Sequence, residues 1–260
     1  MKAAALTISK VSVGYRNGKK EIRVVDGIEA SLQSCGLVAL IGRNGAGKST
    51  LLRTLSAFQK PLSGTIECNG RDIAGLSPND VAKELAVVLT STEPAPLTVR
   101  ELVLLGRTPY TNFMGNLTAR DNAVVNDAMK LMGVSCFEKR LLSTLSDGER
   151  QKCMIAKALA QETSLILLDE PTAFLDFGSK VALFRTLKKL ARESHKAILV
   201  STHDIELAIR FADKLWLLSD GALNEGTVDE LSDSGALQHF VNGEGVVYDK
   251  ENNRIEIIEI

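Results

Sequence analysis

Five short apolar runs recur along the chain, and they limit its possible folds more than any other feature. Each run is apolar at consecutive positions, which is typical of parallel strands that helices cover on both faces. Residues at helical spacing follow two of the runs, so strand and helix alternate and predict a wound α/β sheet. The runs are GLVALIG (36–42), LAVVLTS (85–91), SLILLDE (164–170), AILVSTHD (197–204) and KLWLLSDG (214–221). The helical positions are Leu51, Leu52, Leu55 and Phe58, then Val181, Phe184, Leu187 and Leu190.

Three stretches depart from this alternation. Residues 1–34 are apolar at alternate positions, which predicts antiparallel strands beside the main sheet. Residues 97–162 contain no convincing strand and read as several helices. The tail GVVYDKENNRIEIIEI alternates on each side of Glu251-Asn252-Asn253, so we expect a β-hairpin there.

Composition excludes several classes of protein. The 31 Lys and Arg nearly balance the 32 Asp and Glu, so charge gives no reason to expect nucleic acid or an anionic bilayer as a partner. The 4 cysteines form no CxxC pair, which argues against a zinc or redox motif and indicates packing residues in a reducing compartment. No apolar run reaches the ~18 residues that cross a membrane, and the N-terminus alternates too soon for a signal peptide. We therefore expect a cytosolic protein, which could still bind to a membrane protein.

A glycine-rich cluster joins the first apolar run to the helix after it. The cluster GRNGAGKS (42–49) fits the phosphate-loop pattern GxxxxGK[ST] and has the strand and helix context that this pattern requires. Glycines let the backbone wrap around phosphate oxygens, and a helix N-terminus offers unpaired N–H groups. Lys48 would then reach the β and γ phosphates, and the Ser49 hydroxyl would bind Mg²⁺. A plain glycine-rich turn is the alternative.

Acidic residues end one of the other apolar runs. Asp169 and Glu170 lie at the carboxyl edge of the predicted sheet, where α/β proteins bind their ligands. Asp169 suits the Mg²⁺ shell, and Glu170 is placed to orient or deprotonate a water that attacks the γ-phosphate. His203 ends the next run and could reach the same edge, although a lone histidine there is more often structural. We expect His195 and His239 to face solvent.

A second cluster, LSDGE, begins at Leu145. Ser146 and Glu149 form an SxxE capping box, so its simplest interpretation is a helix start. A helix start alone does not explain Gly148, or an exposed helix N-terminus that could accept an anion. Because the phosphate loop already holds one face of a nucleotide, we expect this second end to serve a nucleotide bound to another copy of the chain.

These motifs, in this order over roughly residues 5–225, resemble the ATP-binding cassette ATPases, the nucleotide-hydrolysing subunits of ABC transporters. The resemblance implies an α/β fold: a P-loop NTPase (RecA-like) core with an antiparallel β subdomain and an inserted α-helical subdomain. It also implies a homodimer that holds two ATP molecules, with Mg²⁺, head to tail between the copies. The expected segments are 1–92 and 163–225 for the core, 93–162 for the helical subdomain and 226–260 for a C-terminal extension, all within one domain (1–260).

The resemblance assigns roles one residue at a time. Tyr15 would stack on adenine, unless it is a core aromatic, and Asp176 in AFLD would cross the dimer interface. Ser146 and Gly148 would touch the γ-phosphate of the partner's nucleotide. The expected catalytic residues are Lys48, Glu170 and His203, and the expected metal ligands are Ser49, Thr90 and Asp169. The expected nucleotide-binding residues are Tyr15, Gly42, Asn44, Gly45, Ala46, Gly47, Lys48, Ser49, Thr50, Ser146, Gly148, Glu149 and Asp176.

Two positions depart from the family's pattern. Asp147 stands where the signature usually has glycine, and an acid near a phosphate is unfavourable unless it points away. Thr90 stands where the family normally has glutamine; its hydroxyl could still bind Mg²⁺ or water, but the side chain is shorter. This second change bears on the coupling between nucleotide and transporter.

The stretch LTVRELVLLGRTPYTN (97–112) resembles importer ATPases that serve iron-siderophore, haem and cobalamin permeases. It implies an importer subunit on the cytoplasmic face of the inner membrane, with permease subunits, indirectly a substrate-binding protein, and no nucleic acid as partners. An amphipathic helix followed by a Gly-Arg-Thr-Pro turn is the structural alternative. The alternative function is a permease-independent cassette ATPase, such as one for iron-sulphur cluster assembly. A kinase or GTPase is disfavoured because LSDGE has no role there and NKxD is absent.

Overall fold

The computed structural model describes residues 4–18, 20–89, 96–111, 116–243 and 245–257 of the 260-residue chain. Its centre is a six-stranded sheet in the order β10-β9-β3-β8-β7-β6. Five of these strands are parallel, and each lies within one of the five apolar runs, as predicted. They are β3 (Leu37–Gly42), β6 (Leu85–Val88), β7 (Leu165–Leu168), β8 (Ala197–Thr202) and β9 (Lys214–Ser219).

The sixth strand, β10 (Ala222–Gly226), pairs antiparallel with β9 and was not predicted. Asp220 and Gly221 form the two-residue turn between them, with φ of 51° and 74°. Positive φ at both positions is the type I′ geometry that joins hairpin strands, and Asp-Gly is a preferred sequence for it. The Asp-Gly pair was therefore the signal for this strand.

A second sheet is antiparallel and has the strand order β2-β1-β4-β5. Its two long strands, β1 (Ala4–Asn17) and β2 (Lys20–Gln33), confirm the antiparallel pairing predicted for residues 1–34. The shorter strands β4 (Ser63–Cys68) and β5 (Arg71–Asp72) complete it. The mixed architecture confirms the α/β fold class.

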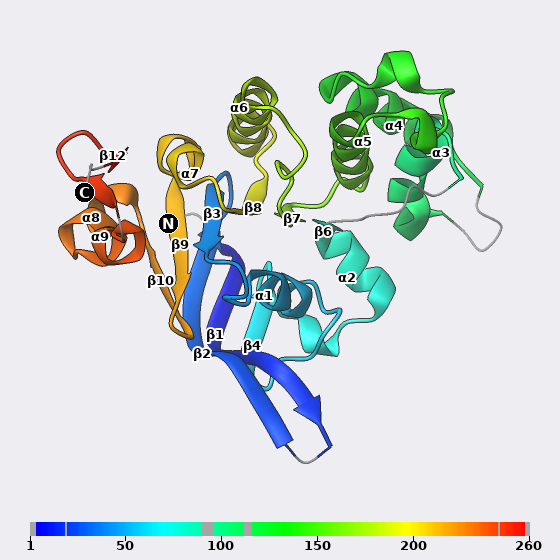
Figure 1. The fold of residues 1–260 in the computed structure, drawn as a ribbon. Coiled ribbons are helices and arrows are strands. Elements are labelled where there is room, and N and C mark those ends of the chain that lie inside the picture. Colours follow the sequence, from blue (N-terminus) through cyan, green and yellow to red (C-terminus); the bar gives the residue numbers. More distant parts are fainter. Residues whose placement is uncertain (1–3, 19, 90–95, 112–115, 244, 258–260) are drawn as a thin grey trace.

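Strand β3 separates two hydrophobic cores. Val38 and Leu40 pack with the antiparallel sheet and with α1 (Lys48–Leu55), whereas Leu37, Ala39 and Ile41 pack on the opposite face. That face is covered by α6 (Phe177–Glu193) and α7 (Ile205–Phe211), and Figure 1 shows the two layers on either side of the strands. Burial on both faces explains why the run is apolar at consecutive positions.

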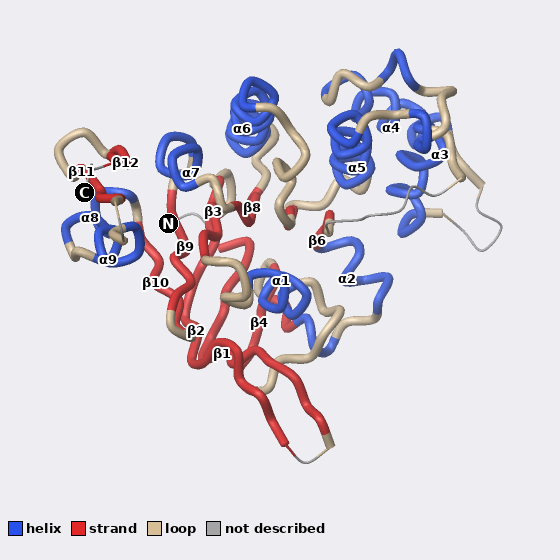
Figure 2. Tube along the Cα trace, in the orientation of Figure 1, coloured by secondary structure: helices blue, strands red, loops and turns tan. Residues whose placement is uncertain are grey.

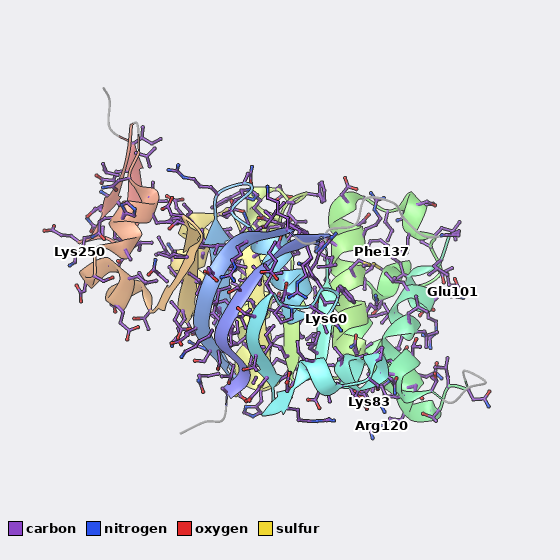
Figure 3. The ribbon with its side chains drawn as sticks, turned by 90° about the horizontal axis from the view of Figure 1, so that it is seen from below. Lys60, Lys83, Glu101, Arg120, Phe137 and Lys250 are labelled. Atoms are coloured by element: carbon purple, nitrogen blue, oxygen red, sulfur yellow. The ribbon has the colours of Figure 1, made fainter. Side chains whose placement is uncertain are left out.

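Helices occupy both ends of the sheet (Figure 2). On one side lies a helical lobe of α3 (Val99–Leu104), α4 (Ala119–Leu131) and α5 (Asp147–Ala160), with short 3₁₀ helices η2 (Leu105–Tyr110), η3 (Ser135–Phe137) and η4 (Leu142–Thr144). On the other side lie α8 (Val228–Asp233), α9 (Ala236–Val241) and a hairpin of β11 (Val246–Asp249) and β12 (Arg254–Ile257). Figure 3 shows Glu101 and Phe137 in the lobe and Lys250 at the opposite end. The remaining elements, η1 (Ile73–Gly75) and α2 (Pro78–Glu84), precede β6.

Some expectations about single residues were wrong. Helix α1 ends at Leu55, and Phe58 lies beyond it with 65% of its surface exposed, because Ala57 adopts a left-handed conformation (φ 61°) that ends the helix. Cys136 is exposed rather than packed, and Cys35 is only half-buried. Cys68 and Cys153 are buried as expected, and burial raises the pKa of both thiols to about 12.

Two further sequence-based statements concern the surface. His195 and His239 are both exposed, as predicted. Over the described part of the chain, none of the helices combines the length and the apolar composition needed to cross a bilayer.

Candidate functional site

The loop between β3 and α1 has a backbone that only glycine adopts without strain. Gly45 and Gly47 have φ of 81° and 105°, in the left-handed region. A Cβ on Gly47 would lie 2.5 Å from Cγ1 of Val24 in β2, so this position also lacks room for a side chain. Gly47 is the N-cap of α1, and no side chain caps the helix. The first N–H groups of α1 therefore remain available to an anion.

Lys48 lies over this loop and is buried. Its Nζ donates a hydrogen bond of 2.7 Å to the carbonyl oxygen of Gly42 and lies 3.6 Å from Oε1 of Glu170. The lysine thus joins the phosphate loop at the end of β3 to the acidic residue that follows β7. A phosphate that enters the loop would meet an ammonium group already directed at it.

A cavity of about 410 Å³ opens beside the loop and collects several of the predicted residues. Tyr15 of β1 stands at its edge with 49% of its surface exposed, and its hydroxyl shares a hydrogen bond of 2.8 Å with Oγ1 of Thr50. Tyr15 is therefore not the core aromatic of the alternative interpretation. The lining residues are Tyr15, Val24, Arg43, Asn44, Gly45, Gly47, Lys48, Ser49, Thr50 and Glu170.

Ser201 of β8 fixes both carboxylate residues after β7. Its hydroxyl donates to Oδ1 of Asp169 at 2.7 Å and accepts from the backbone N–H of Glu170 at 2.8 Å. Glu170 has a φ of 45°, a conformation that costs a non-glycine residue about 1 kcal/mol or more and clusters at functional sites. Sequence reasoning missed Ser201, although a hydroxyl residue at the carboxyl end of a neighbouring parallel strand was a usable signal.

The Glu170 carboxylate lies between two potential cations. One oxygen faces Lys48, and the other, Oε2, is 2.9 Å from Nδ1 of His203. The imidazole is 54% exposed, so it remains accessible to a ligand from the open side. The structure thus brings Lys48, Glu170 and His203 together, as the sequence predicted, across the ends of three parallel strands.

The structure describes two of the three predicted metal ligands, Ser49 and Asp169. Asp169 is buried and does not itself line the cavity, whereas Ser49 does. The described residues contain no cluster of three or more His, Cys, Asp or Glu that would hold a metal alone. One carboxylate and one hydroxyl are hard oxygen donors, and Mg²⁺ commonly takes few protein ligands together with phosphates of the substrate. The donor set therefore fits Mg²⁺ that arrives with a nucleotide; Thr90 lies outside the described residues.

The second cluster forms the start of α5. Ser146 is its N-cap, and the capping box is complete: Glu149 N–H donates to the serine hydroxyl, and Ser146 N–H donates to Oε2 of Glu149 at 2.8 Å. Hydrogen bonds from the Ser146 backbone and hydroxyl hold the pKa of Glu149 below its usual value. A Cβ on Gly148 would lie 2.7 Å from Cδ2 of Leu175, so packing within the chain accounts for part of the glycine requirement.

The charge of Asp147 is directed along the helix. Its carboxylate forms an ion pair with Arg150, one turn further on, so it need not oppose an anion at the helix tip. Asp176 is the N-cap of α6 and accepts hydrogen bonds from Ser179 N–H and Oγ at 2.8 and 2.9 Å. Neither Asp176 nor the residues at the tip of α5 line the cavity. A single chain therefore does not bring the LSDGE cluster to the cavity beside its own phosphate loop.

Sequence comparison finds two family models that match the chain. The model described as "ABC transporter" matches residues 25–173, and an AAA domain model (putative AbiEii toxin, Type IV TA system) matches residues 139–210. An uncharacterized ABC transporter ATP-binding protein of Methanocaldococcus jannaschii is 44% identical over 83% of this chain and 73% of its own length. The iron(3+)-hydroxamate import ATP-binding protein FhuC of Bacillus subtilis is 35% identical over 96% of this chain and 93% of its own. The cobalamin import ATP-binding protein BtuD of Halobacterium salinarum is 38% identical over 78% of this chain and 51% of its own length.

Solved structures show the same fold. The dimeric structure of MJ0796, described as a bacterial ABC transporter cassette, superposes with a TM-score of 0.75 at 26% identity over 85% of this chain and 98% of that one. An inward-facing conformation of a putative metal-chelate type ABC transporter gives a TM-score of 0.78 at 26% identity over 99% and 98%. MJ0796 has also been solved as a dimer in a post-hydrolysis state bound to ADP and Pi, with a TM-score of 0.74 at 26% identity over 85% and 98%.

Proposed function

Because this chain belongs to the ABC transporter family of ATPases, we propose that it powers an importer of an iron-siderophore, haem or cobalamin through a membrane permease. The observation that carries the proposal is the position of Glu170, between Lys48 and His203 at the mouth of the phosphate loop. Matches to importer subunits over almost the whole chain support the cargo class. They do not favour a permease-independent role such as iron-sulphur cluster assembly.

The phosphate loop and Lys48 bind the triphosphate of ATP in this proposal. Backbone N–H groups at the start of α1 and the ammonium group of Lys48 face the β and γ phosphates, where negative charge increases during cleavage. Tyr15 stacks on adenine from the edge of the cavity. Ser49 and Asp169 would hold Mg²⁺, which when bound would offset the negative charge of the phosphates.

Glu170 orients the attacking water and accepts its proton. Ser201 fixes the Glu170 backbone, and His203 and Lys48 hold its two carboxylate oxygens, so the base is positioned before substrate arrives. General-base catalysis of this kind typically contributes about 10²- to 10⁴-fold to a rate. His203 also reaches the γ-phosphate from its exposed side.

Two copies of the chain complete each site. The Ser146 end of α5 is an exposed helix N-terminus that does not line its own chain's cavity, which suits it to the nucleotide of a second copy. In a head-to-tail dimer, the Ser146 end of each copy contacts the nucleotide of the other copy. ATP then favours the closed dimer because it touches both chains, and hydrolysis reopens it. The permease follows these motions at the cytoplasmic face of the membrane, and a substrate-binding protein delivers cargo on the other side.

The proposal is tested with Glu170→Gln, which keeps the shape of the side chain and removes the base. We expect ATP with Mg²⁺ to shift this variant to a stable dimer in gel filtration, whereas the parent chain hydrolyses ATP and returns to monomer. A monomer at saturating ATP contradicts the two-chain site.

Cargo is tested in the host strain after deletion of the gene. Uptake of a radiolabelled iron-siderophore, haem and cobalamin is measured with the parent gene restored and with Glu170→Gln restored. Loss of one uptake activity, recovered by the parent gene alone, is expected. Unchanged uptake of all three, with reduced iron-sulphur enzyme activity, would instead support the permease-independent alternative.

A further inference from the structure

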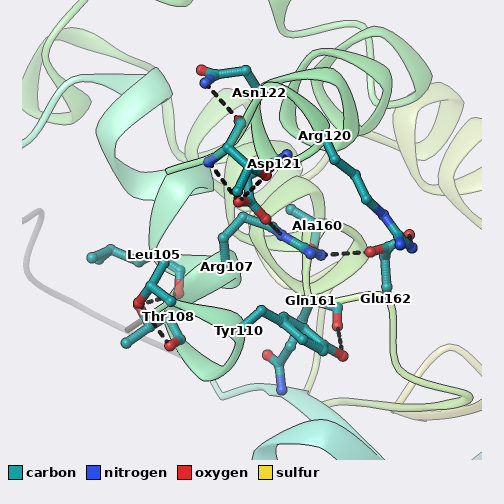
Figure 4. Close-up of polar contacts among 12 residues, drawn as sticks. Leu105, Arg107, Thr108, Tyr110, Arg120, Asp121, Asn122, Ala160, Gln161 and Glu162 are labelled. Carbon is teal, nitrogen blue, oxygen red and sulfur yellow. Dashed lines mark hydrogen bonds and ion pairs between the residues drawn. The ribbon is translucent and has the colours of Figure 1, made fainter. Parts of the chain in front are cut away.

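The segment LGRTPY, which forms η2, lies directly against the C-terminal end of α5 (Figure 4). A Cβ on Gly106 would lie 2.3 Å from the carbonyl oxygen of Lys157, so the two backbones are in contact and glycine is required. The motif that resembles importer subunits thus has a structural role inside the helical lobe.

Arg107 holds the end of α5 from within. Its side chain is 4% exposed, and Nη1 donates to Ala160 O and to Oε2 of Glu162, both at 2.7 Å. Its Nε donates to Asp121 of α4 at 2.8 Å. A guanidinium at this place satisfies a carbonyl that the helix leaves unpaired and complements the negative end of the helix dipole.

Tyr110 also contacts the end of α5 and stacks on Arg107. Its ring centroid lies 4.4 Å from the guanidinium carbon of Arg107, and its hydroxyl donates to the carbonyl oxygen of Gln161 at 2.9 Å. Two successive carbonyls at the end of α5 are therefore fixed by one turn of η2, as the dashed contacts in Figure 4 show. We call Arg107, Tyr110 and Gln161 the α5 clamp.

The side chain of Gln161 connects the clamp to the core. Its Nε2 donates to Ala82 O at 2.5 Å and to Leu85 O at 2.9 Å. Ala82 is in the last turn of α2, where carbonyls lack a partner within the helix, and Leu85 begins β6 of the central sheet. The clamped end of α5 is thus hydrogen-bonded to the sheet through one glutamine.

The opposite end of the same helix carries Ser146. Helix α5 has 14 residues and spans about 21 Å at about 1.5 Å per residue. A tilt of about 10° about the clamped end would displace the Ser146 end by about 4 Å, which exceeds a hydrogen-bond length. Small changes at Gln161 are therefore amplified at the tip.

We propose that Gln161 is a positioning residue for ATP hydrolysis: its bonds to Ala82 and Leu85 fix the direction of α5, and thereby the place where Ser146 meets the nucleotide of a second copy. The inference rests on the proposed function, because it takes the Ser146 end to complete the partner's site. It adds a role for the α5 clamp that is separate from binding of the first nucleotide.

The test uses Gln161→Leu, which keeps the size of the side chain and removes both bonds to the core. In the Glu170→Gln background we expect the ATP-dependent dimer to dissociate at about tenfold higher concentration, because a displaced Ser146 end would lose about 1.4 kcal/mol of its interaction with the partner's nucleotide. Binding of a fluorescent ATP analogue to the single chain should not change. With Glu170 intact, kcat should fall while KM for ATP stays the same. Tyr110→Phe, which removes one hydroxyl, should show a smaller effect in the same direction.

A matched control and a second measurement separate the outcomes. Gln33→Leu makes the same substitution at an exposed strand end far from α5 in sequence and should behave like the parent. Spin labels at Asp147→Cys and Lys60→Cys, with the four native cysteines replaced by alanine, report the direction of α5 in a single chain. We expect Gln161→Leu to broaden that distance distribution.

Two results overturn the positioning role. One is an unchanged distance distribution in Gln161→Leu, and the other is an equal loss of ATP binding and dimerisation, which would indicate a purely structural residue. If Glu170→Gln alone fails to dimerise while Gln161→Leu still broadens the distribution, the two-chain site fails and the control of α5 by Gln161 stands.

Discussion

Substitution of Ser201 by alanine should separate catalysis from nucleotide binding. Ser201 is fully buried and joins Asp169 to the backbone N–H of Glu170. The substitution removes a hydrogen bond to the Asp169 carboxylate and leaves the partly buried Glu170 N–H without its partner, which together should lower the free energy of unfolding by about 2 to 4 kcal/mol. For a chain of this size that corresponds to a melting temperature lower by about 5 to 10 °C.

The effect on the rate follows from the backbone of Glu170. Its left-handed conformation is held against strain, and without Ser201 the residue can relax and move its carboxylate. A displacement of about 1 Å can cost about 10²-fold in rate, so kcat should fall by about that factor. KM for ATP should change less than kcat, within about threefold, because Lys48 and the phosphate loop make no hydrogen bond to Ser201 in the described structure and Ser201 is linked to the nucleotide site only through Asp169 and the backbone of Glu170.

The assay is phosphate release at saturating Mg-ATP, beside fluorescent nucleotide binding and thermal denaturation. Ser232→Ala is the matched control, because Ser232 is also buried but its hydroxyl oxygen has no hydrogen-bond partner in the described structure. That variant should keep the parent's kcat and change stability by less than about 1 kcal/mol. If Ser201→Ala hydrolyses ATP as fast as Ser232→Ala does, Ser201 does not position Glu170.

Further predictions concern adenine and acid stability. Tyr15→Ala should raise KM for ATP about tenfold by loss of stacking, and Tyr15→Phe should raise it little, as measured by steady-state hydrolysis. Hydrogen bonds from Thr118 and Arg107 lower the pKa of Asp121 to about 2 from its ordinary 3.8. A lowered carboxyl pKa stabilises the fold above the unfolded-state value, so this stability is full above pH 3.8 and is lost as pH falls toward 2. Urea titrations from pH 7 to pH 2 should show that loss in the parent, and a much smaller loss of this contribution in Asp121→Asn.

The strands of the central sheet were predictable because burial on both faces leaves a strong pattern. Leu37 to Ile41 must be apolar without interruption, since alternate residues enter different cores. The phosphate loop was equally clear, because the backbone at Gly47 excludes every side chain. In both cases a local constraint determines the residue type, and so the sequence reports it directly.

Other features depend on contacts between distant segments, and the sequence indicates them only weakly. Ser201 is one hydroxyl among many until β7 and β8 lie side by side, and Gln161 bonds to Ala82 and Leu85 across more than 70 positions of sequence. Tyr15 alternates like a core residue, and only the family resemblance indicated the place that it takes at the open edge of the site. Arg107 reads as part of a turn, although it is among the most buried charged residues described.

The two-faced burial of β3 also has a consequence for the length of the strand. Both faces of β3 are apolar, so a strand shortened by one residue would still place hydrophobic side chains in both cores. Each side chain beyond the deletion would then enter the opposite core. The phosphate loop would be displaced by about 3.3 Å along the sheet edge, and Lys48 would be drawn away from Glu170. Deletions in this strand should therefore abolish ATP hydrolysis before they abolish folding.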